Sequence, residues 1–305
     1  MRALITGVCG QDGWYLSEFL LSKGYEVIGT RRGNEEPEEA PEGVQVVYGD
    51  VTDASCIRTL IEKYEPEEVY NLAAVTHVGD SFSAMSNSFQ VNAVGVANTL
   101  DAAARVGSKF YQASTSELFG DTPPPQSERS MMRPRSPYAV AKLAGFWLTK
   151  NYRERGVHAC NGILFNHESP RRGGGVVSQK VARAVAAIKK GRQQHVVLGN
   201  LDAQRDWGHA KDFVRAMWLM MQHKPDDYVV ATGEMRSVRD LCEVAFGYAG
   251  LDYRNHVRTS EQFYRPLEVE KLCGDYAKAE KELGWKPEVR FDDMIREMVD
   301  AAIER

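Results

Sequence analysis

Long apolar runs are missing from this sequence. No stretch approaches the roughly 20 apolar residues that a helix needs to span a bilayer, and even residues 216–221 are closely flanked by charge. The N-terminus runs from Met1 directly into a short strand-like segment, without the basic and apolar regions of a secretory signal. We therefore expect a soluble, cytoplasmic protein that has no membrane partner.

Charge of one sign is also scarce. The 38 Lys and Arg residues nearly balance the 42 Asp and Glu residues, which leaves a formal net charge of -4. The basic residues are scattered, so the basic patch of a nucleic-acid-binding protein is absent and we expect no such partner. The acidic stretch from Glu35 to Glu42 is most simply a solvated loop.

Closely spaced cysteines and histidines are lacking as well. An odd number of widely spaced cysteines argues against a disulfide framework or a CxxC site and favours a reducing compartment; they are Cys9, Cys56, Cys160, Cys242 and Cys273. The seven histidines form no HExxH pattern, and His77, His167 and His209 each stand alone. We predict no metal site.

What the sequence does contain is an alternation of short β-branched runs with helical patterns. The expected strands are residues 2–6, 26–30, 44–48, 68–72, 109–113 and 158–165, and the expected helices are residues 13–23, 54–64, 86–106 and 137–155. Strands that alternate with helices form parallel sheets. Six or more such steps predict an α/β fold with a doubly wound parallel sheet of the Rossmann type.

The pattern changes after Asn166. A glycine-rich loop at 170–175, a helix near 178–190 and a polar segment before Arg205 indicate a second region, yet residues 210–222 are helical and 227–232 strand-like. We therefore predict discontinuous domains. The first comprises residues 1–165, with 206–232 returning to it, and a smaller C-terminal domain comprises residues 166–205 and 233–305.

Gly7, Gly10 and Gly13 lie between the first strand and the first helix. Glycines permit a tight turn and close approach of a pyrophosphate to the backbone, and the helix N-terminus favours its negative charge. The bare GxxGxxG spacing also fits an ordinary turn, but the strand and helix around it favour a dinucleotide site that includes Gln11 and Asp12.

The end of the second strand indicates which dinucleotide is bound. NAD-preferring domains usually carry an acidic residue there, whereas this chain has Arg31 and Arg32, which suit a 2′-phosphate. We therefore expect NADP rather than NAD. Asp50 and Val51, after the next strand, are placed to reach the adenine, although Asp50 fits equally well as the cap of the following helix.

Tyr138 and Lys142 are four residues apart on a predicted helix, so both side chains project from one face. An ammonium group beside a phenol favours the phenolate, and we expect Lys142 to lower the pKa of Tyr138 so that it accepts a proton from a sugar hydroxyl. Alone, YxxxK is common on protein surfaces. Joined to the glycine turn and the run from Ala113 to Gly120, it is a strong signal.

Over its whole length the chain resembles the extended short-chain dehydrogenase family. The resemblance is carried by Ser136-Pro-Tyr138-Ala-Val-Ala-Lys142 and by Asn71-Leu72-Ala73-Ala74. It implies that Thr115 or Ser116 assists Tyr138 and Lys142 in catalysis, and that Leu72, Ala73 and Ala74 lie beside the cofactor.

Residues 162–173, 199–210 and 264–266 more closely resemble the GDP-mannose 4,6-dehydratase family, in the nucleotide-sugar branch. This resemblance implies that Glu117 removes the C5 proton of the sugar and protonates the departing C6 hydroxyl. It also implies cofactor contacts from His167 and Arg172 and substrate contacts from Ser81, Asn166, Lys180, Arg205, Arg265 and Glu268. Without it, Glu117 fits an exposed loop residue, Asn166 and Glu268 fit loop caps, and the arginines fit solvated charges.

The implied function is a lyase that converts GDP-mannose to GDP-4-keto-6-deoxymannose through internal hydride transfer by tightly bound NADP, in a homodimer or homotetramer. The resemblance also places Met131, Met132 and Arg133 at the border of the sugar pocket.

Three alternatives stay open. The first is a GDP-4-keto-6-deoxymannose reductase, against which Glu117 argues. The second is a dehydratase or epimerase acting on another GDP-sugar such as GDP-manno-heptose. The third is a catalytically idle NADP-binding sensor, which the presence of Thr115, Glu117, Tyr138 and Lys142 disfavours.

Overall fold

A computed structural model describes residues 1–33, 39–264 and 267–305. Its central feature is a seven-stranded sheet with the order β10-β6-β5-β4-β1-β2-β3, in which every neighbouring pair is parallel. The strands are β1 (Arg2–Thr6), β2 (Glu26–Arg31), β3 (Val44–Tyr48), β4 (Glu68–Asn71), β5 (Lys109–Ala113), β6 (Ala159–Leu164) and β10 (Asp227–Val230). The predicted Rossmann-type sheet is confirmed.

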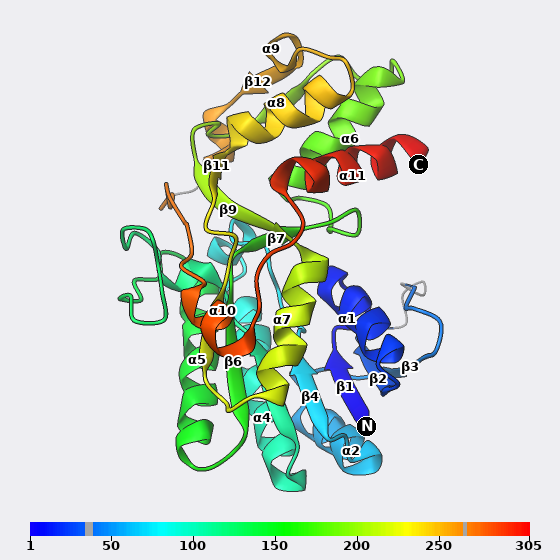
Figure 1. Ribbon diagram of the computed structural model, residues 1–305, viewed down its shortest axis with the longest axis vertical. Helices are drawn as coiled ribbons and strands as arrows, with labels where there is room; N and C mark the ends of the chain where they lie inside the picture. The colour runs from blue at the N-terminus through cyan, green and yellow to red at the C-terminus, as the bar shows by residue number, and fades with distance from the viewer. Residues whose placement is uncertain (34–38, 265–266) are drawn as a thin grey trace.

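Helices cover both faces of this sheet (Figure 1). One face carries α1 (Gln11–Ser22) and α7 (Ala210–Gln222), and the other carries α2 (Ala54–Tyr64), α4 (Gly95–Val106) and α5 (Pro137–Glu154). Every residue of β4 and β6 is buried, as expected for parallel strands covered on both sides. None of the helices in the described parts of the chain has the length and apolarity needed to cross a membrane.

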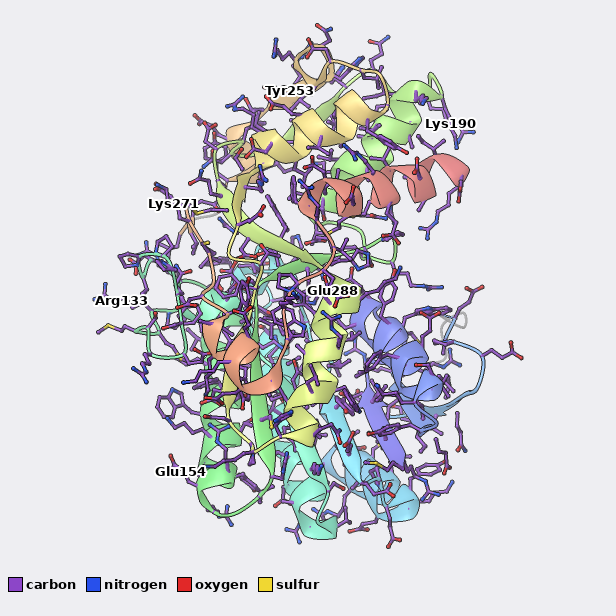
Figure 2. The ribbon with its side chains drawn as sticks, in the orientation of Figure 1. Arg133, Glu154, Lys190, Tyr253, Lys271 and Glu288 are labelled. Carbon is purple, nitrogen blue, oxygen red and sulfur yellow. The ribbon has the colours of Figure 1, made fainter. Side chains whose placement is uncertain are left out.

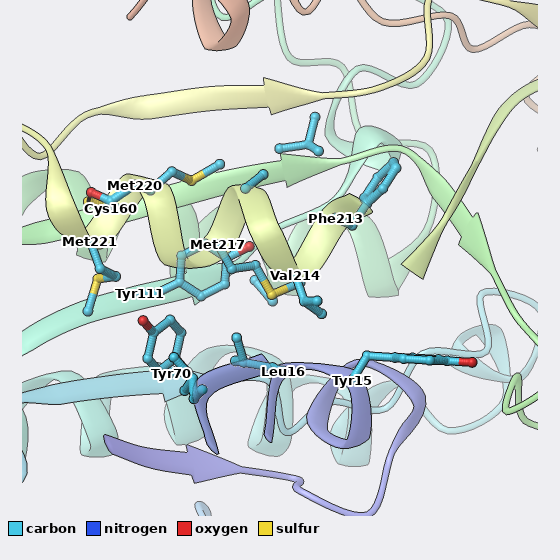
Figure 3. Close-up of a cluster of buried hydrophobic side chains, with 14 of the residues drawn as sticks. Tyr15, Leu16, Tyr70, Tyr111, Cys160, Phe213, Val214, Met217, Met220 and Met221 are labelled. Atoms are coloured by element: carbon cyan, nitrogen blue, oxygen red, sulfur yellow. Dashed lines mark hydrogen bonds between the residues drawn. The ribbon is translucent and has the colours of Figure 1, made fainter. Parts of the chain in front are cut away.

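The core beneath α1 and α7 is shown in Figure 3. Leu16 of α1 and Met217 of α7 face the sheet, where Tyr70 and Tyr111 pack with their rings 5.9 Å apart. Methionine side chains are unbranched and fill irregular gaps, which suits the space between aromatic rings and a helix. This packing fixes α1, and with it the glycine turn before it, against the sheet.

The helix that carries Tyr138 begins where its sequence dictates. Ser136 is extended, and its side chain accepts a hydrogen bond from the backbone N–H of Ala139, while Pro137 occupies the first helical position. Both choices are favourable, because Ser satisfies a helix N–H that has no partner within the helix and Pro has no N–H to satisfy. Tyr138 therefore lies in the first turn of α5 and Lys142 one turn later.

A second group of elements lies above the carboxyl ends of the sheet strands (Figure 1). A three-stranded sheet and a two-stranded sheet pack with α6, α8 and α11 around a core that contains Trp207, Leu241 and Met294. The group comprises β7 (Asn166–Glu168), α6 (Val177–Lys189), β8 (Val196–Leu198), β9 (Gln204–His209), β11 (Met235–Ser237), α8 (Val238–Tyr248), α9 (Tyr253–His256), β12 (Val257–Thr259) and α11 (Phe291–Glu304). In the chain between β9 and β11, helix α7 and strand β10 return to the large sheet. Helix α10 (Ala277–Leu283), which comes later in the chain, packs beside them.

Asp206 of β9 links the two groups of elements. It is fully buried, and its carboxylate accepts hydrogen bonds from Thr232 N (2.7 Å), Thr232 Oγ1 (2.7 Å), Gly233 N (2.8 Å) and Gly274 N (3.2 Å). Burial raises its pKa to about 6 while these donors oppose the shift, so the group is ionised at neutral pH.

We expect Asp206→Asn to lower the free energy of unfolding by about 1–3 kcal/mol, because an amide nitrogen would face donors that now bond a carboxylate. Urea denaturation at neutral pH measures the change. The matched control is Asp202→Asn, which removes an exposed ion pair with Arg239 and should change stability by less than about 1 kcal/mol. Equal effects in the two variants would contradict a special role for Asp206.

Candidate active site

A cavity of about 540 Å³ opens between the carboxyl ends of the large sheet and the elements above it. Its walls come from the segments that follow β4, β5 and β6, from α5, and from β7, α6 and β9. Ligands of open parallel sheets bind at this edge, where loops rather than strands present side chains. The cavity is therefore the candidate active site.

The glycine turn lies at the same edge. Gly7 has a positive φ of 71°, and a Cβ there would lie 3.0 Å from the Cα of Ala73. A Cβ on Gly13 would lie 2.5 Å from the carbonyl oxygen of Val8. Because both contacts are with backbone, only glycine fits, and the turn remains open to a phosphate at the N-terminus of α1. These residues fit a dinucleotide.

The residues expected near the adenine of the cofactor lie in different surroundings in the structure. Arg31 and Arg32 lie at the end of β2, partly buried and exposed respectively. Asp50 accepts hydrogen bonds from the backbone N–H and hydroxyl of Thr52, both at 2.8 Å. The alternative that Asp50 caps the next helix is wrong, because Asp53 is the cap of α2. Val51 is buried and packs against Gly95 rather than opening toward solvent.

The five predicted catalytic residues all line the cavity; they are Thr115, Ser116, Glu117, Tyr138 and Lys142. Two elements bring them together, namely the segment after β5 and the start of α5. Thr115 caps the short 3₁₀ helix η3 (Ser116–Leu118), with its hydroxyl accepting a hydrogen bond from Glu117 N at 3.2 Å. That cap fixes the backbone on which Glu117 stands, and the Thr115 hydroxyl also bonds the Tyr138 phenol.

The electrostatics of the Tyr138 and Lys142 pair differ from the prediction. Burial raises the pKa of Tyr138 to about 12, with the Thr115 hydrogen bond opposing the rise and the charge of Glu117 adding to it. Burial lowers the pKa of Lys142 to about 8. The expected lowering of the Tyr138 pKa by Lys142 is therefore wrong for this structure, because burial of the phenol raises its pKa and the groups that oppose the rise are Thr115 and Arg172.

Lys142 is held in place by the strand beside it. Its Nζ donates to the backbone oxygen of Ala113 at 3.0 Å and lies 6.0 Å from the centre of the Tyr138 ring. The ammonium group is thus oriented between the end of β5 and the tyrosine. This position allows it to bond a ligand hydroxyl and stabilise the phenolate through space.

Three of the predicted cofactor residues bond one another. The two ring nitrogens of His167 lie 2.9 Å from Asp12 Oδ2 and 2.8 Å from the backbone oxygen of Phe165, and Gln11 Nε2 donates to Asp12 Oδ1 at 3.1 Å. Burial alone would lower the pKa of His167, but Asp12 raises it overall. The pKa of Asp12 is lowered, because His167 outweighs its burial. Asp12 and His167 therefore each favour the charged form of the other at the edge of the cavity.

The predicted substrate residues are only partly brought together. Asn166 and Lys180 line the cavity, as does Arg172, whose Nε lies 3.2 Å from Glu168 Oε2. Arg205 instead donates to the backbone oxygen of Gln204 at 2.9 Å and to Glu268 Oε1 at 3.3 Å. Neither residue of this pair is in the cavity wall of the described chain.

Ser81 and Arg265 complete the predicted set. Ser81 is buried, accepts a hydrogen bond from Tyr138 N at 3.2 Å and donates to the backbone oxygen of Val78 at 2.6 Å. It thus supports the first turn of α5. Arg265 lies outside the described residues. Met131 and Arg133, expected at the border of the pocket, are exposed and are not in the described wall. Arg133 lies at the side of the molecule (Figure 2).

Sequence reasoning missed part of the wall. The missed residues include Thr76, His77, Val78, Gly79, Gly175, Val176, Val177, Leu198, Gln262 and Phe263. Residues 76–79 follow β4, so their place after a parallel strand was the signal that could have identified them. Residues 262–264 reach the cavity through tertiary packing, where Phe263 contacts Gly199 and Lys180, and no local pattern indicates this.

Comparison with known proteins agrees with this geometry. The family described as GDP-mannose 4,6 dehydratase matches residues 4–298. GDP-mannose 4,6 dehydratase 1 of Arabidopsis thaliana is 49% identical, covering 99% of this chain and 90% of that protein. The human GDP-mannose 4,6 dehydratase is 46% identical, covering 99% of this chain and 91% of that protein.

Solved structures show the same fold. UDP-glucose 4-epimerase of Thermus thermophilus, in complex with NAD, has a TM-score of 0.88 at 27% identity and covers 99% of both chains. RMD of Pseudomonas aeruginosa, complexed with NADPH, has a TM-score of 0.83 at 23% identity, covering 100% of this chain and 99% of that chain. With the family matched over nearly its whole length and the predicted catalytic residues gathered in one cavity, this chain belongs to the GDP-mannose 4,6-dehydratase family.

Proposed function

We propose that this protein converts GDP-mannose to GDP-4-keto-6-deoxymannose and water, with NADP as a cofactor that is regenerated in each turnover. The observation that carries the proposal is one cavity wall shared by Thr115, Glu117, Tyr138 and Lys142, in a chain 49% identical to a GDP-mannose 4,6 dehydratase. A reductase would not need the carboxylate of Glu117, and an idle binding protein would not need the tyrosine and lysine.

The turn from Gly7 to Gly13 and the backbone at Ala73 would hold the cofactor, since only glycine fits there. Arg31 and Arg32, at the end of β2, support a 2′-phosphate and hence NADP over NAD. When bound, the nicotinamide supplies a hydride acceptor that also returns the hydride to the sugar, so no external reductant is consumed.

Tyr138 is the base that removes the proton from the sugar O4 hydroxyl. Its pKa of about 12 in this structure means that the phenolate needs nearby positive charge, which Lys142 supplies from α5. Thr115, already bonded to the phenol, holds the sugar O4 in line with the phenol oxygen. Oxidation at C4 produces a ketone, which makes the neighbouring C5 proton acidic.

Glu117 then performs the elimination. Its carboxylate removes the C5 proton and delivers it to the C6 hydroxyl, which departs as water and leaves a C5–C6 double bond. The product is complete when C6 receives the hydride that left C4 and C5 receives the proton that Tyr138 took from O4. One carboxylate suffices because it accepts and donates the same proton. Its position on η3, two residues after Thr115, places it in the same wall as the tyrosine.

The GDP-sugar lies, in this proposal, against the elements above the sheet. Asn166 and Lys180 support contacts with its diphosphate, since both line the cavity on that side. We accordingly assign cofactor binding to residues 1–165 with 206–232, and nucleotide-sugar binding to residues 166–205 and 233–305. The odd number and wide spacing of the cysteines support a reducing, cytoplasmic location.

The test is incubation of the purified protein with GDP-mannose without added reductant, followed by mass spectrometry. We expect a product lighter than the substrate by one water, and no such product from UDP- or dTDP-hexoses. GDP-manno-heptose belongs in the same panel. Unchanged GDP-mannose together with a dehydrated heptose would replace the proposed substrate and retain the chemistry.

A further inference from the structure

The first turn of α1 and the segment 167–171 contact each other through alternate residues. Ser169 Oγ donates to Gln11 Oε1 at 2.8 Å, His167 Nε2 lies 2.9 Å from Asp12 Oδ2, and the guanidinium carbon of Arg171 lies 3.0 Å from the centre of the Trp14 ring. His167 lies in β7, whereas residues 169–172 form a turn in which Arg172 N donates to the backbone oxygen of Ser169 at 3.0 Å. We call these six residues the clamp.

The clamp joins two regions with different proposed ligands. On one side, Gln11 and Asp12 lie within the turn from Gly7 to Gly13, so the clamp includes part of the backbone that would hold the cofactor diphosphate. On the other, Arg172 follows directly on the clamp and lines the cavity. Trp14, Ser169 and Arg171 are not in the cavity wall of the described chain, so they reach a ligand there only through their neighbours.

The connection continues into the substrate side of the cavity. Glu168, which is 2% exposed, lies 3.2 Å from Arg172 Nε and accepts a hydrogen bond from Ser178 Oγ at 2.7 Å. Ser178 is in α6, the helix that also carries Lys180 in the cavity wall. Packed and hydrogen-bonded contacts therefore run without a gap from the glycine turn to α6.

We infer that the clamp couples the two binding sites, so that an occupied cofactor turn holds Arg172 and α6 in the arrangement that binds the nucleotide sugar. The inference rests on the proposed function for the identity of the two ligands. Coupling of this kind is reciprocal, because each ligand must raise the affinity for the other by the same factor. The clamp residues outside the cavity act as positioning residues and not as ligand contacts.

The test uses the full-length chain, titrated with NADP in the absence and presence of saturating GDP. In the wild type we expect GDP to tighten NADP binding by about fivefold or more, the usual lower range of such coupling. Arg171→Met and Trp14→Leu each remove the stacked pair and should bring the coupling factor close to one. The double variant should match the single variants, since both remove the same contact.

Lys23→Met is the matched control. It removes a cation from the ring of Trp218, 4.0 Å away, at the other end of α1, and should leave the coupling factor at the wild-type value. A merely structural role for the clamp would lower thermal stability in all these variants without changing the coupling. A wild-type factor of one, or full coupling in Arg171→Met and Trp14→Leu, would overturn the inference.

The outcome is separable from that of the proposed function. Coupled binding of NADP and GDP in a protein that fails to dehydrate GDP-mannose would contradict the proposed reaction and support the clamp. Dehydration of GDP-mannose by a protein in which NADP and GDP bind independently would support the proposed reaction and contradict the coupling role of the clamp.

Discussion

Tyr138→Phe is expected to lower kcat for GDP-mannose dehydration by about 100- to 10,000-fold, the range that a positioned acid or base contributes. The variant keeps the aromatic ring and loses only the phenolic hydroxyl that Thr115 bonds, so the KM for GDP-mannose should change little. Steady-state kinetics measured by product mass would give both constants.

Tyr111→Phe is the control for this experiment. Tyr111 is a fully buried tyrosine in the core beneath α7, and its hydroxyl has no hydrogen-bond partner among the residues that the structure describes. Its loss should leave kcat within a factor of about two, since buried polar groups without partners add nothing to stability. A kcat in Tyr138→Phe close to that of this control would remove Tyr138 from the reaction.

Glu117→Gln should separate the two halves of the reaction. The amide has the size of the carboxylate but cannot accept the C5 proton, so oxidation at C4 proceeds and elimination does not. With GDP-mannose we expect the absorbance band of reduced nicotinamide to appear and persist. Formation of the dehydrated product should fall by about 100-fold or more.

A control for charge alone is Asp121→Asn, which removes an exposed carboxylate four residues further along that pairs with Arg135 at 2.7 Å. It should turn over normally and show no lasting absorbance change. Dehydration at the wild-type rate by Glu117→Gln would mean that another group performs the elimination. An inactive variant in which no reduced nicotinamide accumulates would instead give Glu117 a role in the first step.

The strands and helices were predictable where the polarity pattern alone determines them. The observed bounds of β3, β5 and α2 coincide with those expected, because buried strands and amphipathic helices leave clear periodicities. The start of α1 was placed two residues late, since Gly10 and Gln11 carry no helical signal. The stretch expected as one helix from 86 to 106 contains a π-helical segment, Gln90–Val94, between α3 (Met85–Phe89) and α4.

That the five residues proposed as catalytic would share one cavity could be predicted because they fall in two short motifs, around Thr115 and Tyr138. The remaining site residues depend on distances that no motif encodes. Arg205 and Glu268 are 63 positions apart, and their mutual contact takes both away from the wall where they were expected. The pKa of Tyr138 is set mainly by how deeply α5 is buried, which spacing on a helix does not reveal.

The hydroxyl of Ser81 has a consequence for how new sugar specificities arise in this fold. It accepts a hydrogen bond from the N–H of Tyr138 and donates one to the backbone oxygen of Val78, so the cavity wall at residues 76–79 ends at a serine that also holds the first turn of α5. Exchanging residues 76–79 while keeping Ser81 is expected to change the shape of the cavity and to leave Tyr138 in place. The segment can therefore be recombined as a module, and libraries at 76–79 built on an unchanged Ser81 should retain turnover far more often than libraries that include it.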